Sequence, residues 1–333
     1  MMKQVWIERP GGPETLTVHA VPIPNPAPQE VRLRVSAAGI SHADLLVRRG
    51  RRHPGSPAIP LSPGFEVAGT VDAVGEGVND LAPGRSVVAI VSHAGYSDFV
   101  CTEAWRCLPL PDGLSEERAA LLGVAYWTAY YLLHHAARLQ AGQSVLIHGA
   151  SGAVGTALAE LDHLAGLQLY GTASAAKHNR LRGYGVTLID YRHEDFVARL
   201  DTLAPQGMQA VFDPIGGANW PRSYRTLRRG GRLLVYGARA LEDGSLLRLL
   251  PYALLTVALA LWPDGRSVRF VGLLPERQRQ SYRRDLAKLL ALLADGLIEP
   301  SLAATFHLTE AAEAHRLLEQ ERPRGKLLLL PKQ

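Results

Sequence analysis

Three glycines recur at every third position where a short apolar run meets a run with helical character. The segment Ile147–Leu158 reads IHGASGAVGTAL and contains Gly149, Gly152 and Gly155. Glycines at a strand-to-helix junction let backbone N–H groups approach the pyrophosphate of a dinucleotide, and the helix N-terminus adds partial positive charge. The spacing G-x-x-G-x-x-G departs from the commoner G-x-G-x-x-G, so a packed turn without a ligand stays open as the alternative.

The chain around this loop alternates between strand and helix patterns. SVLIHG, LQLYGTA, VTLIDY, MQAVFDPIGG and GRLLVYGA predict strands, and AVGTALAELDHLAG and AAKHNRLRGYG predict helices. Such alternation is typical of an α/β domain with a doubly wound parallel sheet. In that fold the loop would offer a cofactor the residues Gly149, Ser151, Gly152, Ala153, Val154 and Gly155.

The flanking regions have a different character. Up to about residue 115 the sequence is rich in strand patterns such as EVRLRVSAAGI, which predicts a small β domain. Ser115 is a candidate N-cap for one long helical region, EERAALLGVAYWTAYYLLHHAARL. The last part of the chain contains the strands SVRFVGLL and GKLLLL around the helix SYRRDLAKLLALLADG. A terminal strand needs a sheet to join, so this tail either returns to the first domain or pairs with another subunit.

The residues after the second strand of the alternating region indicate which dinucleotide is bound. An NAD site places an Asp or Glu about 20 residues after the loop to hold the ribose 2′-hydroxyl. Here that region offers Ser174 and Lys177, and DYR supplies Tyr191 and Arg192 after the third strand. Hydroxyl and cationic groups suit a 2′-phosphate, so NADP(H) is expected rather than NAD(H). Lys177 alone would be an ordinary solvated charge.

Composition limits the other functions that the chain can have. The net charge of +5 is dispersed and no basic run is interleaved with aromatic residues, which argues against nucleic-acid binding. Two cysteines, Cys101 and Cys107, form neither a zinc-knuckle spacing nor a disulfide framework, and the N-terminus lacks an apolar signal segment. We therefore expect a cytoplasmic protein. The apolar run Leu246–Trp262 contains Arg248 and Pro251 and is shorter than the ~20 residues of a spanning helix. It predicts a buried helix, a subunit contact or a substrate lid.

Nearly the whole chain resembles the medium-chain dehydrogenase/reductase superfamily, and within it the zinc-free quinone oxidoreductase (zeta-crystallin-like) branch. The resemblance depends on the ordered motifs AAGISHADLLVRRG, PGFEVAGTVDAVGEGV, YWTAYYLL, HGASGAVG, GTASAAKH, IDYR, DPIGG, GGRLLVYG and EAAEAHRLLE. It implies a GroES-like β domain formed by residues 1–118 and 265–333, and a Rossmann domain formed by residues 119–264. The tail would then return to the first domain.

The resemblance also implies that the chain uses no zinc. Zinc-dependent members carry Cys at the position of Ser41 and His at the position of Phe65, whereas this chain reads GISH and GFE. Phe cannot coordinate a metal and Ser is a poor zinc ligand. His42 is then expected to line the pocket or form hydrogen bonds, and Glu66 to be a structural carboxylate.

The reaction that the resemblance implies is hydride transfer from NADPH to a quinone or another α,β-unsaturated carbonyl compound. Tentative pocket residues are Ser41, His42 and Tyr96; His53, Tyr96 or water could replace a Tyr that relatives carry in the pocket loop. Thr128 and Gly237 match positions beside the nicotinamide in relatives. Relatives are commonly oligomers, and Ser267–Leu274 is a candidate edge strand for a homodimer. A nucleotide-binding protein with little turnover is the alternative function.

Overall fold

The computed structural model describes residues 1–51, 58–237, 246–261, 263–320 and 323–331. The chain divides into two compact units. The first unit consists of Met1–Trp127 and Pro275–Gln333, and the second consists of Thr128–Leu274. The boundaries expected from the sequence, after residues 118 and 264, lie before the boundaries of these units, which follow Trp127 and Leu274.

The first unit is built on a seven-stranded sheet in the order β14-β15-β3-β4-β5-β7, with β6 also paired to β3. Its strands are β3 (Glu30–Ile40), β4 (Glu66–Val74), β5 (Ser86–Ile90), β6 (Phe99–Glu103), β7 (Cys107–Pro109), β14 (Leu302–His307) and β15 (Lys326–Leu330). A two-stranded sheet of β1 (Met2–Ile7) and β2 (Leu16–Val21) accompanies it. β15 pairs antiparallel with β3, so the tail returns to the first domain as expected.

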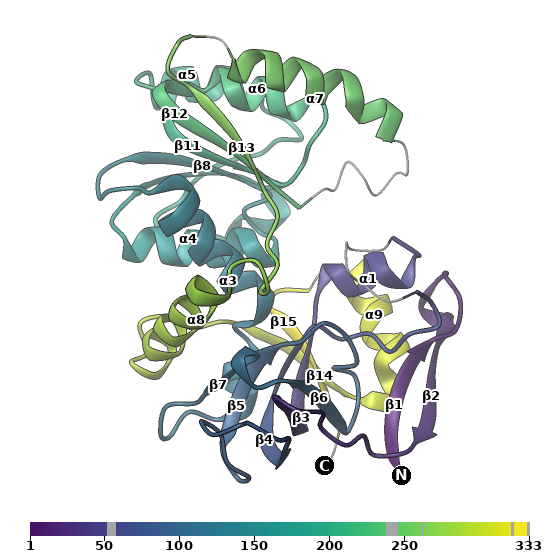
Figure 1. The fold of residues 1–333 in the computed structure, drawn as a ribbon. Helices are drawn as coiled ribbons and strands as arrows, with labels where there is room; N and C mark the ends of the chain where they lie inside the picture. Colours follow the sequence, from purple (N-terminus) through teal and green to yellow (C-terminus); the bar gives the residue numbers. More distant parts are fainter. Residues whose placement is uncertain (52–57, 238–245, 262, 321–322, 332–333) are drawn as a thin grey trace. The chain divides into compact units, whose positions relative to one another are not determined.

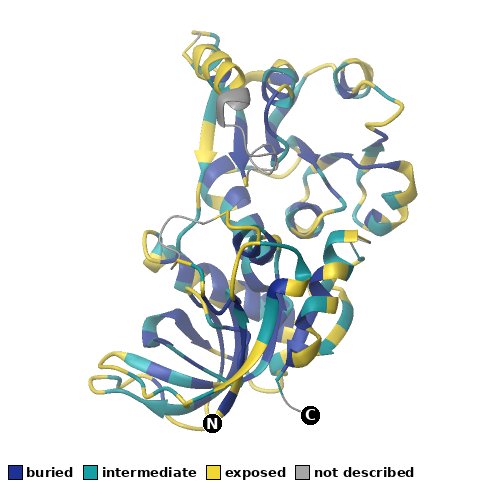
Figure 2. Ribbon diagram, turned by 90° about the vertical axis from the view of Figure 1, so that its right-hand side faces the viewer, coloured by how far each residue is buried: buried dark blue, intermediate teal, exposed yellow. Residues whose placement is uncertain are grey.

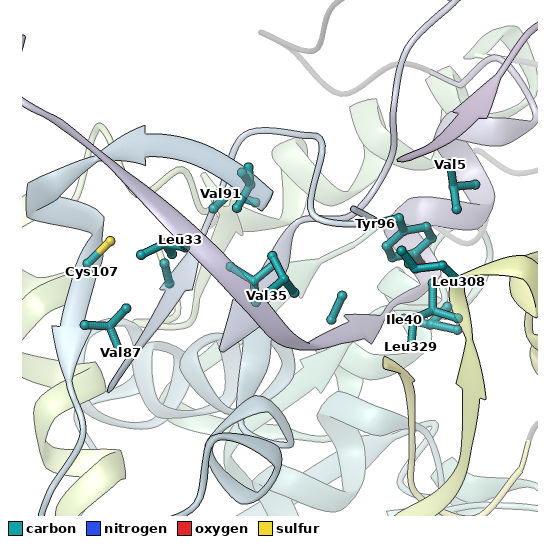
Figure 3. Packing of buried hydrophobic residues seen from close by; sticks show 14 of the residues in the cluster. Val5, Leu33, Val35, Ile40, Val87, Val91, Tyr96, Cys107, Leu308 and Leu329 are labelled. Carbon is teal, nitrogen blue, oxygen red and sulfur yellow. The ribbon is translucent and has the colours of Figure 1, made fainter. Parts of the chain in front are cut away.

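The core of the first unit forms from the alternating apolar positions of these strands. Leu33 and Val35 of β3, Val87 of β5 and Leu329 of β15 lie in one buried cluster (Figure 3). Alternation at a period of two places every second residue on the same face of a strand, which is why the pattern EVRLRV predicts β3. The helices of this unit are α1 (His42–Arg48), α2 (Glu116–Ala120), α8 (Arg279–Ala294) and α9 (Ala311–Gln320).

The second unit contains a six-stranded parallel sheet in the order β10-β9-β8-β11-β12-β13. The strands are β8 (Ser144–His148), β9 (Gln168–Thr172), β10 (Thr187–Ile189), β11 (Met208–Asp213), β12 (Leu227–Tyr236) and β13 (Ser267–Val271). Buried residues concentrate on its inner strands (Figure 2). The direction of winding reverses between β8 and β11, and open α/β sheets bind ligands outside the carboxyl ends of strands at such a point.

The helices of the second unit are α4 (Ala153–Leu164), α5 (Phe196–Leu203), α6 (Asn219–Arg225) and α7 (Leu246–Ala260), which Figure 1 labels around this sheet. The segment Ala175–Leu181, which the sequence predicts as a helix, forms a 3-10 helix. β13 pairs with β12, so this strand belongs to the second unit, although the predicted boundary placed it in the first domain. Its apolar pattern indicates a strand but does not indicate which sheet the strand joins.

The long helical region expected after Ser115 is divided. Ser115 caps α2 by accepting a hydrogen bond from the Arg118 N–H at 3.3 Å. α3 then begins anew and runs over Gly123–Tyr131, followed by a π-helical turn over Leu132–Ala137. Gly123 adopts a φ of +43°, which a continuous right-handed helix does not contain. The helical pattern alone does not reveal this break.

The apolar run near residue 250 forms α7, on which several large apolar side chains are exposed although Thr256 is buried. Leu250 is 52% exposed, Leu254 is 61% exposed and Leu255 is 48% exposed. The expectation of a buried helix is therefore wrong for these side chains, while a subunit contact or a lid stays a prediction. Among the described residues, no helix is both long and apolar enough to span a membrane.

Candidate cofactor site and substrate-side residues

The glycine loop connects the end of β8 with the start of α4, at the edge where winding reverses. Gly149 has a φ of +62°. A Cβ at Gly155 would lie 2.4 Å from the Gly149 carbonyl oxygen, and one at Gly152 would lie 3.2 Å from it. The tight packing explains the repeated glycines, because any larger residue at 155 would push the loop away from the helix.

The start of α4 can receive an anionic group. Gly152 is its N-cap and provides no side-chain cap. The first N–H groups of a helix, here those of Ala153, Val154 and Gly155, have no acceptor inside the helix. The loop therefore presents donors beside the positive end of a helix of twelve residues, which fits a pyrophosphate.

The four residues expected at the 2′-phosphate follow two neighbouring strands. Ser174 comes after β9 at the N-cap position of the 3-10 segment, and its carbonyl accepts the Lys177 N–H at 2.8 Å. Tyr191 and Arg192 come after β10, which pairs in parallel with β9. The Ala173 N–H donates to the Ile189 carbonyl at 3.1 Å, which joins the two strand ends. Tyr191 is 56% exposed.

Asp190, the carboxylate that could serve an NAD ribose, is held by its own turn. It accepts hydrogen bonds from the Arg192 N–H at 3.1 Å and contacts the His193 Nδ1 at 2.7 Å. The His193 contact and the Arg192 N–H lower the pKa of Asp190, as does a hydrogen bond from the backbone of Ala175. These partners stabilise the turn, and the Ala175 contact ties it to the segment after β9.

Gly237 and Gly149 of the glycine loop both lie beside Pro214. A Cβ at Gly149 would lie 3.8 Å from Pro214 Cγ, and a Cβ at Gly237 would lie 3.9 Å from Pro214 Cβ. Gly237 has a φ of +62°. Thr128 lies in α3, and its neighbour Trp127 is buried with its ring 5.3 Å from that of Tyr282, which is a core-packing role.

In the first unit, Ser41 is the N-cap of α1. The Ser41 N–H and hydroxyl donate to one carboxylate oxygen of Asp44, at 2.7 Å and 2.6 Å. The other oxygen of Asp44 accepts the Gly64 N–H at 3.0 Å. Burial raises the pKa of Asp44 to about 6, although the Ser41 hydrogen bonds lower it. His42 is exposed at the first position of the helix.

Tyr96 does not line an open pocket in this structure. Its side chain is fully buried in the core cluster (Figure 3), and its hydroxyl lies 3.2 Å from His315 Nε2. Burial raises the pKa of Tyr96, with further contributions from Asp44 and Glu66. The core and α9 cover Tyr96 here, and a direct contact of Tyr96 with a substrate stays a prediction. His53 lies outside the described residues.

Sequence reasoning missed the polar residues that surround these groups. His315 of α9 lies 3.3 Å from Arg48 Nη1, and Arg48 is paired with Glu319. Burial lowers the pKa of His315 to about 3, so the imidazole stays uncharged. The S-x-x-D spacing of Ser41 and Asp44 is a capping-box signal that could have been read from the sequence, whereas the contact with α9 is not local.

The residues at the positions of zinc ligands do not fit a zinc ion. The Ser41 hydroxyl donates to Asp44, and Phe65 packs against the apolar cluster of Ile7, Val47 and Leu61. Glu66 is paired with Lys326 and accepts the Val124 N–H at 2.6 Å. Within the described ranges, no group of three or more His, Cys, Asp or Glu side chains is arranged to hold a metal.

Comparisons with known proteins identify the family of the chain. The family described as alcohol dehydrogenase GroES-like domain matches residues 27–141, and the family described as zinc-binding dehydrogenase matches residues 185–329. The rat synaptic vesicle membrane protein VAT-1 homolog is 35% identical over 322 residues, covering 94% of this chain and 79% of the relative. Rat quinone oxidoreductase is 28% identical over 337 residues, covering 99% of this chain and 98% of the relative.

Solved structures give the same result. The Escherichia coli quinone oxidoreductase complexed with NADPH has a TM-score of 0.86 at 28% identity, over 99% of this chain and all of the other. The fold is thus a GroES-like domain with a Rossmann domain, the architecture of an oxidoreductase class. The chain belongs to the medium-chain dehydrogenase/reductase superfamily, among its quinone oxidoreductases and VAT-1 homologues.

Proposed function

We propose that the protein transfers hydride from NADPH to a quinone or another α,β-unsaturated carbonyl compound without zinc. One arrangement carries the proposal. The glycine loop precedes α4 at the point where the winding of the sheet reverses. The ends of β9 and β10 offer cations and hydroxyls, while Asp190 is held by its own turn. The NADPH complex of the Escherichia coli relative supports the same cofactor. When bound, NADPH supplies the hydride.

The residues of the second unit would bind and orient the cofactor. The backbone N–H groups of Ala153, Val154 and Gly155 would hold the pyrophosphate, and Gly237 would leave room for the nicotinamide half. Lys177, with Ser174, Tyr191 and Arg192, would recognise the 2′-phosphate through charge-assisted hydrogen bonds. Thr128 is proposed beside the nicotinamide.

The acceptor is a compound that can delocalise negative charge without a Lewis acid. A quinone or enone spreads the charge of the arriving hydride onto its oxygen, so the protein mainly supplies orientation and hydrogen-bond donors. Ser41 and His42 are the proposed side chains on the acceptor side, and the Ser41 hydroxyl hydrogen would have to leave Asp44 before it could bond the acceptor oxygen. Asp44 fixes the direction of the Ser41 hydroxyl.

The test is a fluorescence titration of the purified protein with NADPH and with NADH. We expect tighter binding of NADPH, and in Lys177→Ala an NADPH affinity at least about tenfold weaker, or about 1.4 kcal/mol. NADH affinity should not change in this variant. Lys288→Ala, an exposed lysine of α8, is the matched control. Equal affinities of the wild type for both cofactors would refute the NADP assignment.

A second candidate function is nucleotide binding with little turnover. The VAT-1 homologue, at 35% identity, is named for a vesicle membrane and not for a reaction. NADPH oxidation measured with and without quinones and enones separates the two. Only an enzyme shows oxidation that depends on the acceptor.

We also propose a homodimer through Ser267–Leu274 and a cytoplasmic location. β13 is the outer strand of the parallel sheet, and an unpaired edge favours pairing with another chain. Phe270 on this strand is 54% exposed. The free thiols of Cys101 and Cys107 suit a reducing compartment.

A further inference from the structure

A buried chain of polar side chains joins the carboxyl ends of three neighbouring strands in the second unit. His148 ends β8, Thr172 ends β9 and Asp213 ends β11, and these strands are adjacent in the sheet. Ser223 of α6 completes the chain. All four side chains are buried, with exposed fractions between 0 and 3%.

The hydrogen bonds around Asp213 fix the direction of the chain. One carboxylate oxygen accepts the N–H groups of Ile215 at 2.8 Å and Gly216 at 3.2 Å. The other accepts the Asn219 amide at 2.8 Å and the Ser223 hydroxyl at 2.7 Å. Both oxygens of Asp213 therefore act as acceptors.

The hydrogen bonds of Ser223 determine which nitrogen of His148 carries the proton. Ser223 has a single hydroxyl hydrogen, and Asp213 receives it. The Ser223 oxygen, 3.0 Å from His148 Nε2, must then accept, so Nε2 carries the hydrogen. Nδ1 is left as an acceptor for the Thr172 hydroxyl at 2.9 Å. The hydrogen bonds therefore run in one direction, from Thr172 through His148 and Ser223 to the acceptor Asp213.

The surroundings of His148 favour the neutral ring. Burial lowers its pKa; Asp213 acts in the opposite direction and Arg222 in the same direction as burial. The ring packs edge-on against Phe196, with centroids 4.7 Å apart. A charged ring would have hydrogens on both nitrogens and would deprive Thr172 of its acceptor.

This series of hydrogen-bonded side chains lies next to the loops that would bind the cofactor. Gly149 directly follows His148, Ser174 lies two residues beyond Thr172, and the turn held by Asp213 contains Pro214, which lies beside both Gly149 and Gly237. We propose that His148 is a positioning residue, which in its neutral Nε2–H form locks the three strand ends and so sets the spacing of the loops that bind NADPH. The inference builds on the proposed cofactor function.

The first test needs no cofactor. Nitrogen-15 NMR of histidine side chains in the full chain, assigned with His148→Gln, should show the Nε2–H tautomer of His148. The ring should stay neutral at pH 6, where a histidine with the ordinary pKa of about 6.5 is mostly charged. An Nδ1–H tautomer, or a charged ring at pH 6, would overturn the proposal. Amide hydrogen exchange at Ile215 and Gly216 should be faster in His148→Leu than in the wild type.

The second test measures NADPH affinity in matched variants. Gln can place a donor near the position of Nε2, while Leu removes both polar contacts. We expect NADPH affinity at least tenfold weaker in His148→Leu, intermediate in His148→Gln and unchanged in His163→Leu, an exposed histidine of α4. Thermal unfolding checks that each variant is folded; if the Leu variant is not, the Gln variant and the wild-type NMR decide.

The outcomes separate this inference from the proposed function. Failure of the proposed function appears in the wild type, which would bind neither nicotinamide cofactor. Failure of the positioning role appears as wild-type NADPH affinity in folded His148→Leu, or as unchanged exchange at Ile215 and Gly216. A role in packing alone predicts that Leu, an apolar side chain beside Phe196, binds as well as Gln or better.

Discussion

Gly123 occupies a position where a side chain would strike a buried ion pair. Its φ is +43°, and a Cβ there would lie 1.6 Å from Glu66 Oε2. Glu66 is paired with Lys326 and accepts the Val124 N–H at the start of α3. The carboxylate of Glu66 thus accepts a hydrogen bond from the N-terminus of α3 and pairs with Lys326 of β15, which is a structural role.

Replacing this glycine should destabilise the first unit strongly. In Gly123→Ala the left-handed backbone costs about 1–2 kcal/mol, and displacing Glu66 from its partners adds roughly 3–5 kcal/mol. Chemical denaturation measures the free energy of unfolding. Gly84→Ala is the control, because Gly84 has a φ of +88° with nothing within 4 Å of its Cβ. Equal losses in the two variants would contradict the clash with Glu66.

Asp44 should give the protein a stability that decreases as the pH rises. Its folded pKa of about 6 lies above the ordinary value of 3.8, so between these values the folded state binds more protons than the unfolded state. The free energy of unfolding then falls by about 2 kcal/mol from pH 4 to pH 6. Asp44→Asn should lack this contribution. Urea denaturation across this range checks it, and parallel profiles for the two proteins would refute it.

At the level of elements, the sequence predicts strands better than the breaks between helices. The strands of the second unit and β15 follow from their apolar runs, because burial on a sheet face determines them. The division of the helix at Gly123 depends on Glu66, which is distant in sequence. The 3-10 form of Ala175–Leu181 and the contact between α1 and α9 likewise depend on tertiary neighbours.

In the candidate site, too, the sequence predicts local features but not contacts between distant segments. The glycine loop and the residues after β9 and β10 could be located from spacing, since a strand, a loop and a helix are local features. The burial of Tyr96 under His315 could not, because α9 comes from the far end of the chain. Asp213 and Ser223 lack a spacing signal that connects them with His148.

The edge strand β13 should determine the oligomeric state. If Ser267–Leu274 pairs two subunits, Phe270→Asp places a charge in an apolar contact and should convert a dimer to a monomer. Sedimentation velocity measures the mass. Val18→Asp, at an exposed apolar position of β2 in the first unit, should leave the dimer intact. A monomeric wild type would exclude the proposed dimer.

At the level of the whole molecule, the two units depend on the last strand to different degrees. Leu327, Leu328 and Leu329 of β15 are buried, and β15 lies between β14 and β3. The second unit is one continuous segment with its own core around Val211 and Leu233.

A chain that ends at Gly325 should therefore lose the first unit and keep the second. We expect loss of the buried ion pair of Glu66 and of the pairing with β14. NADPH binding should be retained, and the chain should unfold less cooperatively. Calorimetry with and without NADPH measures this, because a ligand stabilises the unit that binds it. A chain that ends at Pro331 serves as the control. A single unaltered transition in the shorter chain would contradict the division.

The position of β15 also affects how the protein is made. A ribosome releases residues in order, so the continuous segment Thr128–Leu274 emerges while the sheet of the first unit still lacks β14 and β15. Domains generally fold as units during synthesis. The first unit is thus completed after the second unit has emerged, and until then the edge of β3 and the carboxylate of Glu66 lack their partners from β15.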